Sequence, residues 1–109
     1  MMNPADYDVA FAIISSAGNA KSNAMMAIRA AREGDLDEAA RLLAAADEGL
    51  HEAHTAQTAM LTQEARGTAV PVNIVLVHAQ DHLAGAMLVR DLADEFVHLY
   101  RRTSALAAS

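Results

Sequence analysis

The chain has 109 residues, no cysteine, 53% hydrophobic residues and a formal net charge of −6. The missing cysteines exclude a disulfide framework and a thiolate zinc site, and the lack of clustered Lys or Arg argues against nucleic acid as a partner. No apolar run approaches the roughly 20 residues of a membrane span, and the first residues lack a basic signal segment, so we expect a cytoplasmic protein without direct membrane insertion.

The first predicted element is a helix over about residues 6–33. Small or aliphatic residues recur along it every three or four positions, which is typical of a helix that packs closely against another. These residues are Ile13, Ala17, Ala20, Ala24, Ala27 and Ala31. A larger set lies beside them, namely Phe11, Ile14, Gly18, Lys21, Met25 and Ile28. Gly34 follows at the position where a left-handed residue commonly ends a helix.

A second helix is predicted over about residues 35–64. Asp35 is its candidate N-cap, and Glu38 could bond back to the amide of Asp35 to complete a capping box. Because so short a joint reverses the chain, we expect the first two helices to form an antiparallel hairpin. The segment holds seven acidic residues against Arg41 alone, which fits either a solvated face or a basic protein partner.

Residues 65–72, which include Gly67 and Pro71, are predicted to form the main loop. Asn73 is a candidate cap for a third helix over about residues 73–105. Its expected core-facing seam has heptad-like spacing and consists of Val75, His78, His82, Gly85, Val89, Leu92, Phe96 and Leu99. The sequence therefore predicts an all-α fold, an up-down-up antiparallel bundle of three long helices forming one domain over residues 1–109.

Segment 74–89 is apolar on every side of a helical projection. A helix in a three-helix monomer should keep one face in water. In a domain this small, another subunit is the available cover for the second apolar side. We therefore expect the chain to self-associate.

Three ionisable side chains, His78, Asp81 and His82, interrupt this apolar segment and share one broad helix face. Such groups are costly to bury unless they are paired or functional. One interpretation is a purely structural oligomer in which they pair across a buried seam. A second is a metal site, because two histidines at i and i+4 can chelate zinc, with His51 or His54 as possible further ligands.

The string His78-Ala79-Gln80-Asp81-His82 is similar to the H-x-x-E-H motif of inverzincins, but it has Asp in place of Glu.

A third interpretation is phosphoryl acceptance on histidine. A neutral imidazole is nucleophilic near neutral pH and needs no separate base. A carrier of this kind requires an accessible histidine, a group that holds the other ring nitrogen, and donors for the phosphoryl oxygens.

The string from Val77 to Leu83, VHAQDHL, resembles the signature of the lactose/chitobiose (lactose/cellobiose-specific) IIA components of the bacterial phosphoenolpyruvate-dependent sugar phosphotransferase system. Two further blocks agree with this resemblance. Gly18 to Ser22 resembles the family's G-x-A-[RK]-S pattern on the first helix, and Glu52 to Thr58 resembles its E-A-H-x-x-Q-T pattern on the second. The three blocks occur in the family's order and span nearly the whole chain.

The resemblance implies a homotrimer of three-helix bundles that acts as a phosphocarrier, a phosphotransferase component rather than a stand-alone enzyme. His78 would accept a phosphoryl group from HPr and pass it to a cysteine of the IIB component. The IIB component would then phosphorylate a disaccharide or β-glucoside that enters through the IIC permease. No organic cofactor is implied.

The resemblance also suggests roles for the polar residues around His78. Asp81 matches a family aspartate near the trimer axis that binds a divalent cation, and oxygen ligands favour Mg²⁺ or Mn²⁺. His82, Gln80 and Gln57 become candidates for holding the phosphoryl group or positioning His78, with a polar role in the core as the alternative. His51 and His98 match no motif and are expected at the surface.

Overall fold

The computed structural model describes residues 4–108 and contains three long helices. α1 spans Pro4–Arg32, α2 spans Leu36–Ala65 and α3 spans Ile74–Ala108, so the expected helix ends differ from these by one to three residues. No strand occurs among the described residues, and the predicted all-α class is confirmed. Residues 1–3 and 109 of the predicted domain lie outside the described part.

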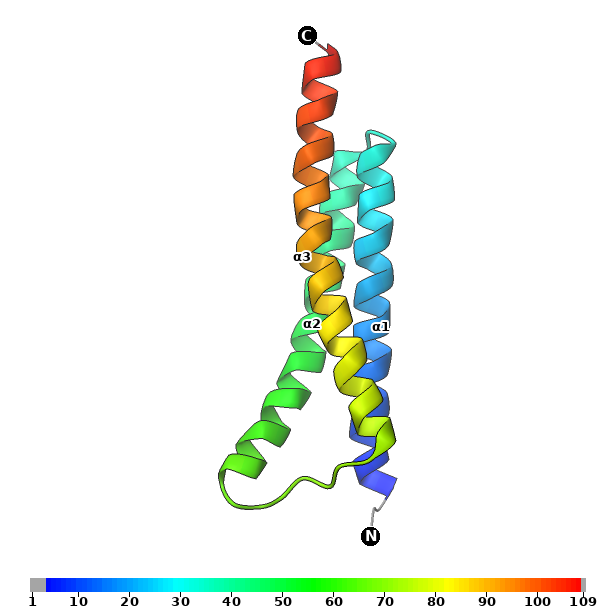
Figure 1. Ribbon diagram of the computed structural model, residues 1–109. Helices are drawn as coiled ribbons and strands as arrows, with labels where there is room; N and C mark the ends of the chain where they lie inside the picture. The colour runs from blue at the N-terminus through cyan, green and yellow to red at the C-terminus, as the bar shows by residue number, and fades with distance from the viewer. Residues whose placement is uncertain (1–3, 109) are drawn as a thin grey trace.

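The molecule is a rod of about 63 × 22 × 18 Å. The α1–α2 turn lies at one end, where α3 extends beyond the other two helices, and the α2–α3 loop lies at the opposite end (Figure 1). The second half of α2 diverges from the other helices toward that loop. No helix within residues 4–108 is long and apolar enough to cross a membrane.

A Schellman motif ends α1. Gly34 has φ 86°, and this left-handed conformation favours glycine. Its amide donates to the Ala31 carbonyl at 3.0 Å, and the Asp35 amide donates to the Ala30 carbonyl at 2.9 Å. Two carbonyls at the end of the helix are thereby satisfied. The turn predicted at Gly34 is confirmed.

Asp35 caps α2 as predicted, because its Oδ1 accepts a hydrogen bond from the Glu38 amide at 3.1 Å. The reciprocal bond expected from Glu38 to the Asp35 amide is wrong, since that amide already donates to Ala30. The Glu38 carboxylate instead accepts from Arg41 Nε at 2.7 Å and from its Nη2. These hydrogen bonds hold the pKa of the Glu38 carboxyl below its ordinary value.

The buried face of α1 is the small-residue stripe. All six of its members are at most 1% exposed, whereas Phe11, in the neighbouring set, is 57% exposed. Gly49 of α2 lies at a close approach to α1. A Cβ added there would stand 3.0 Å from the Ser16 carbonyl oxygen and 3.2 Å from Ala20 Cβ. Close approach of the backbones therefore takes the place of large interlocking side chains.

The core-facing side of α3 differs from the predicted seam by one position. Its buried residues are Leu76, Ala79, Leu83, Ala86, Ala93 and Val97. Each of them directly follows a member of the predicted seam, so the expected face is wrong by about 100° of rotation. The cause is the composition of the helix. Because neighbouring stripes of α3 are both apolar, their spacing alone does not show which one packs against α1.

Polar contacts hold the two ends of the loop between α2 and α3. The Glu64 carboxylate accepts a hydrogen bond from the Val70 amide at 2.7 Å. Asn73 Oδ1 accepts from the Leu76 amide at 2.9 Å, which confirms Asn73 as the cap of α3. These two hydrogen bonds fix the path of the loop and the orientation of the first turn of α3.

We expect alanine substitutions at two glycines to differ in sign because only one glycine lies at a close helix approach. Gly18→Ala meets no atom within 4 Å and should raise the free energy of unfolding by about 1 kcal/mol, the ordinary gain in helix propensity. Gly49→Ala must push α1 and α2 apart, and overpacking costs about 1–3 kcal/mol. Urea unfolding at one protein concentration tests this, and equal stabilisation by both changes would contradict it.

Candidate functional site

His78 and His82 form a histidine pair on α3, at the edge of the core rather than inside it. Their Nε2 atoms are 3.0 Å apart, and the rings are perpendicular, with an interplanar angle of 89°. Each histidine directly precedes a buried residue, Ala79 or Leu83. Packing of these two residues sets the rotation of α3, which leaves His78 exposed and His82 half-buried.

A cavity of about 190 Å³ adjoins this pair and is lined by Lys21, His78, Asp81, His82 and Gly85. Lys21 comes from α1, directly after the buried Ala20. Gly85 lies on the same side of α3 as the histidines and leaves the cavity open, since an added Cβ would meet no atom within 4 Å. The cavity can admit a phosphoryl-sized group.

Asp81 lies one turn from His78 and is exposed. Exposed apolar residues, Val77 and Leu88, lie on the same face of α3. Within residues 4–108, no group of three or more His, Cys, Asp or Glu side chains is arranged to hold a metal ion.

Gln57 and Gln80 pair with each other instead of with His78. Gln57 Nε2 donates a hydrogen bond to Gln80 Oε1. Both line a separate cavity between α2 and α3, which also includes Leu76. Two residues along a helix correspond to about 200° of rotation, so Gln80 points away from the side that carries His78. Within one chain these amides join α2 to α3, the alternative role considered for them.

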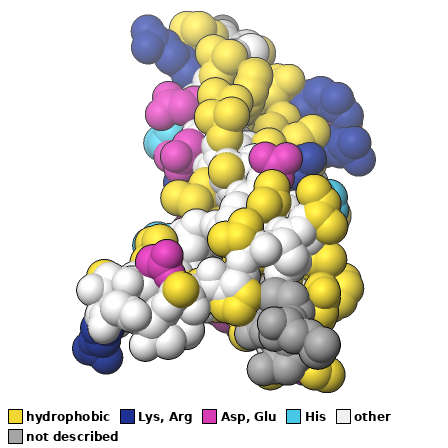
Figure 2. Space-filling view, turned by 60° about the horizontal axis from the view of Figure 1, so that its bottom comes forward, with side chains coloured by type: hydrophobic (Ala, Val, Ile, Leu, Met, Phe, Trp, Pro, Cys, Tyr) yellow, Lys and Arg dark blue, Asp and Glu magenta, His cyan; other side chains and the backbone are white. Residues whose placement is uncertain are grey.

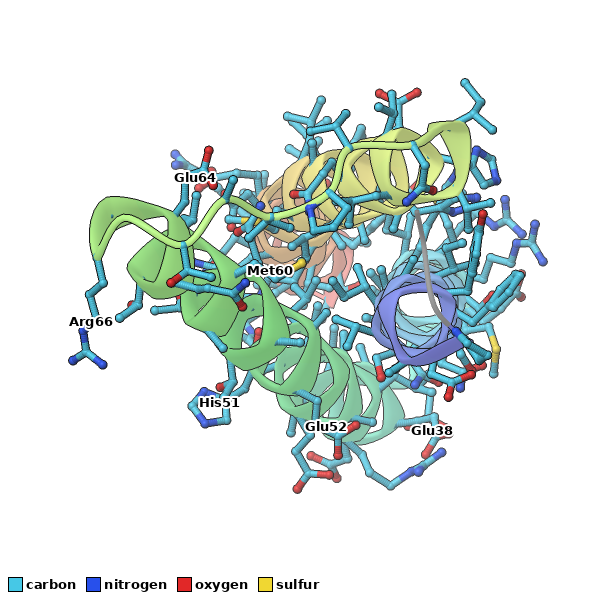
Figure 3. All side chains as sticks on the ribbon, turned by 90° about the horizontal axis from the view of Figure 1, so that it is seen from below. Glu38, His51, Glu52, Met60, Glu64 and Arg66 are labelled. Atoms are coloured by element: carbon cyan, nitrogen blue, oxygen red, sulfur yellow. The ribbon has the colours of Figure 1, made fainter. Side chains whose placement is uncertain are left out.

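The other histidines lie elsewhere. His51 and His54 line a groove of about 320 Å³ between α2 and α3, and Figure 3 shows His51 pointing outward. His98 is exposed, with Nε2 3.7 Å from Asp94 Oδ2. The expected surface positions of His51 and His98 are confirmed. Since the His78–His82 pair lines a different cavity, the geometry does not favour a zinc site shared with the second helix.

An ion pair across the same groove ties α3 to α2. Arg90 Nε and Nη2 donate to the two carboxylate oxygens of Asp47 at 2.6 and 3.0 Å. These hydrogen bonds raise the pKa of the Arg90 guanidinium above its ordinary value. The contact lies on the opposite side of α3 from Asp81 and has a structural role.

The burial of the polar side chains bears on the interpretation of His78 and His82 as purely structural groups. Among the side chains that the structure describes, no polar or charged one is buried. Within the described chain the two histidines therefore lie at the rim of the core and are not sealed inside it. Sequence reasoning did not assign a role to Lys21. Its signal was a lysine in a helix stripe of otherwise uncharged residues, inside a block already noted for its resemblance to a family pattern.

Known proteins share this sequence and fold. The family model described as "PTS system, Lactose/Cellobiose specific IIA subunit" matches residues 8–101. The lichenan-specific phosphotransferase enzyme IIA component of Bacillus subtilis is 44% identical over 101 residues, covering 93% of this chain and 92% of the relative. The crystal structure of the cellobiose-specific enzyme IIA from Bacillus anthracis superimposes with a TM-score of 0.90 at 40% identity, covering 96% of this chain and 95% of that one.

A third match is the IIA component in the solution structure of a IIA(chitobiose)–HPr complex from Escherichia coli. Its TM-score is 0.75 at 33% identity, covering 89% of this chain and 94% of that one. The family match and these similarities cover most of the chain and include the segments that carry Lys21 and the histidine pair. The chain therefore belongs to the lactose/cellobiose-specific IIA family and is a phosphocarrier component of a sugar phosphotransferase system.

Proposed function

We propose that His78 is the phosphoryl acceptor of this protein and that Nε2 is its reacting atom. The observation that carries the proposal is an exposed imidazole whose Nε2 lies at an open cavity, 3.0 Å from a second imidazole nitrogen. HPr would be the donor, because a IIA protein of this fold is solved in complex with HPr. A cysteine of the IIB component would be the next acceptor.

The transfer requires one lone pair and no separate base. With the His78 proton on Nδ1, the Nε2 lone pair attacks phosphorus as the phosphorus–nitrogen bond of the donor breaks, and the electron pair of that bond returns to the donor imidazole. When the group leaves, a thiolate lone pair attacks phosphorus and the electron pair of the P–N bond returns to His78 Nε2. A P–S bond then forms and the P–N bond on His78 breaks.

His82 is the proposed donor beside the reacting nitrogen. When its Nε2 carries a proton, that proton points at His78 Nε2 and holds the second proton of the pair on His78 Nδ1. After phosphorylation the same N–H can donate to a phosphoryl oxygen instead. His82 thus favours the reactive tautomer before transfer and binds the charged group afterwards.

The carrier would act in the cytoplasm, between HPr and the IIB component of a disaccharide or β-glucoside permease. The specificities named for relatives include lichenan, cellobiose and lactose. In this scheme the IIA component does not touch the sugar, so the choice of sugar belongs to the membrane component. The IIC permease is accordingly an indirect partner.

We further propose that the up-down-up antiparallel bundle assembles as a homotrimer through the exposed face of α3. Large apolar side chains on that face recur at spacings of three, four or seven residues when Asp81 is counted among them. They are Ile74, Val77, Leu88, Leu92 and Leu99, all between 48% and 79% exposed. Figure 2 shows hydrophobic side chains spread along one face of the molecule. Patches of this kind usually mark an interface.

Asp81 lies in the middle of this stripe, so a threefold assembly would bring three of its carboxylates together. Like charges held this close repel unless they are protonated or bridged by a cation. An all-oxygen donor set fits Mg²⁺ or Mn²⁺. When bound, the cation would neutralise the carboxylates, and the role of Asp81 would be to link assembly to divalent ions.

The phosphoacceptor assignment predicts that His78→Ala loses all incorporation of phosphate from phosphorylated HPr while its helical circular dichroism is unchanged. His82 remains as the second imidazole at the cavity, but its half-buried ring is proposed to be a donor and not the acceptor. His98→Ala, which changes another exposed histidine of α3, is the matched control and should be labelled normally. Undiminished labelling of His78→Ala would place the acceptor elsewhere.

The role of His82 predicts a rate effect without loss of the site. His82→Ala should accept phosphate roughly 100-fold more slowly, the usual cost of removing one donor to a reacting group. Its product should still be an acid-labile phosphohistidine. Rapid-quench labelling measures the rate. A normal rate, or a protein that no longer folds, would show that the histidine pair is structural.

The trimer proposal predicts that Asp81→Leu is more stable than the unchanged protein in chelator, by several kcal/mol per trimer, because the axial repulsion disappears. Asp81→Asn, which removes charge at nearly constant volume, is the matched variant and should also gain stability. Added Mg²⁺ should stabilise only the unchanged protein. Sedimentation and thermal unfolding provide the measurements, and a trimer weakened by both substitutions would refute the axial placement.

A further inference from the structure

Lys21 is a cation at the phosphoryl cavity that the family assignment leaves without a role. It is the one Lys or Arg among the residues described as lining the cavity, and it comes from α1, whereas the other four come from α3. Its side chain is exposed. Within residues 4–108 no hydrogen bond or ion pair engages the Lys21 ammonium. The ammonium is therefore available to a ligand.

Phosphorylation of His78 changes the charge of this cavity sharply. A phosphoryl group carries about −1.5 to −2 charges at pH 7. Asp81 adds a further negative charge to the same cavity. The two imidazoles are uncharged in the form that reacts, and His82 offers one N–H. Without Lys21, the described chain would place two anionic groups together with no cation beside them.

We infer that Lys21 binds the phosphoryl oxygens on His78, so that α1 supplies the charge compensation and α3 supplies the nucleophile. The inference rests on His78 being the phosphoacceptor. Ala20, next to Lys21, and Ala79, next to His78, are both fully buried, so the core on each helix fixes the rotation that brings Lys21 and His78 to one cavity. Gly85 keeps the cavity free of a side chain that would block the lysine's access.

Lys21 takes no part in bond making. The Nε2 lone pair of His78 forms the new P–N bond, the P–N bond of the donor breaks, and its electron pair stays with the donor imidazole. Throughout this exchange the Lys21 ammonium keeps its protons and donates hydrogen bonds to the nonbridging oxygens. During the transfer negative charge is spread over these three oxygens, where a fixed cation stabilises it.

Two possible roles of Lys21, contact with the partner protein and contact with the phosphoryl oxygens, would change different measured quantities. A lysine that only contacts an acidic patch of the partner would alter KM for phosphorylated HPr. A lysine on the phosphoryl oxygens would alter kcat and the acidity of the bound group. A cation beside the phosphoryl group favours its dianion and so lowers its second pKa.

The test compares Lys21→Gln, Lys21→Arg and Arg29→Gln in the full chain. Arg29 is an exposed cation two turns further along α1 that does not line the cavity, so it controls for loss of one positive charge. For Lys21→Gln we expect kcat for phosphate acceptance from phosphorylated HPr to fall at least about tenfold. The phosphorus NMR titration of its phosphohistidine should move up by about one pKa unit.

Lys21→Arg should restore most of the rate and the lower phosphoryl pKa, and Arg29→Gln should leave both unchanged. A Lys21→Gln protein with normal kcat and an unshifted phosphorus titration would overturn the inference, whether or not its KM rises. Equal losses in Lys21→Gln and Arg29→Gln would also overturn it. Failure of the phosphoacceptor assignment is recognised separately, because labelling would then survive in His78→Ala.

Discussion

Close packing of alanine-lined helix faces is the constraint on which the rest of the structure depends. Along α1, buried positions are alanine with the exception of Ile13, and α2 and α3 meet them with further alanines. An alanine side chain removes little apolar area from water, and burial stabilises by only about 0.8 kcal/mol per methylene. The core is therefore thin, and its stability comes from many short backbone-level contacts rather than from a few large residues.

The thin core and the exposed apolar face of α3 have a common origin. With alanines facing inward, the large residues Leu88, Leu92 and Leu99 are left on the outside of the helix. A monomer with this distribution buries mainly alanine and leaves many of its large apolar residues exposed. A second layer of packing between chains would correct the imbalance, which is why the proposed trimer completes the core in addition to creating a functional surface.

Local features of the fold could be predicted because each depends on a few neighbouring residues. Gly34, Asp35 and Asn73 mark helix ends through hydrogen bonds within five positions, and all three were identified correctly. The rotation of α3 depends on contacts with α1 far away in sequence. Since its successive stripes are both apolar, periodicity could not choose between them, and the predicted seam was one residue off.

In the candidate site, too, local features could be predicted from the sequence and contacts between helices could not. The histidine pair could be predicted, because His78 and His82 are one helical turn apart whatever surrounds them. The pairing of Gln57 with Gln80, and the approach of Lys21 to the cavity, join separate helices. Neither follows from spacing on one helix, although for Lys21 a charged residue in an otherwise uncharged stripe was a signal.

α3 combines three environments within one turn, and their order has an electrostatic consequence. Ala79 faces the core, His78 lies at the rim and Asp81 lies on the exposed stripe. A phosphoryl group on His78 therefore stands beside a carboxylate that the proposed assembly would bring together with its copies. In the proposed assembly each negative group would have its own counter-charge, a divalent cation for the axial carboxylates and Lys21 for the phosphoryl oxygens. Because the two groups occupy neighbouring faces, a charge change at one would alter the electrostatic free energy at the other, so the proposed cation binding and phosphoryl occupancy would be linked.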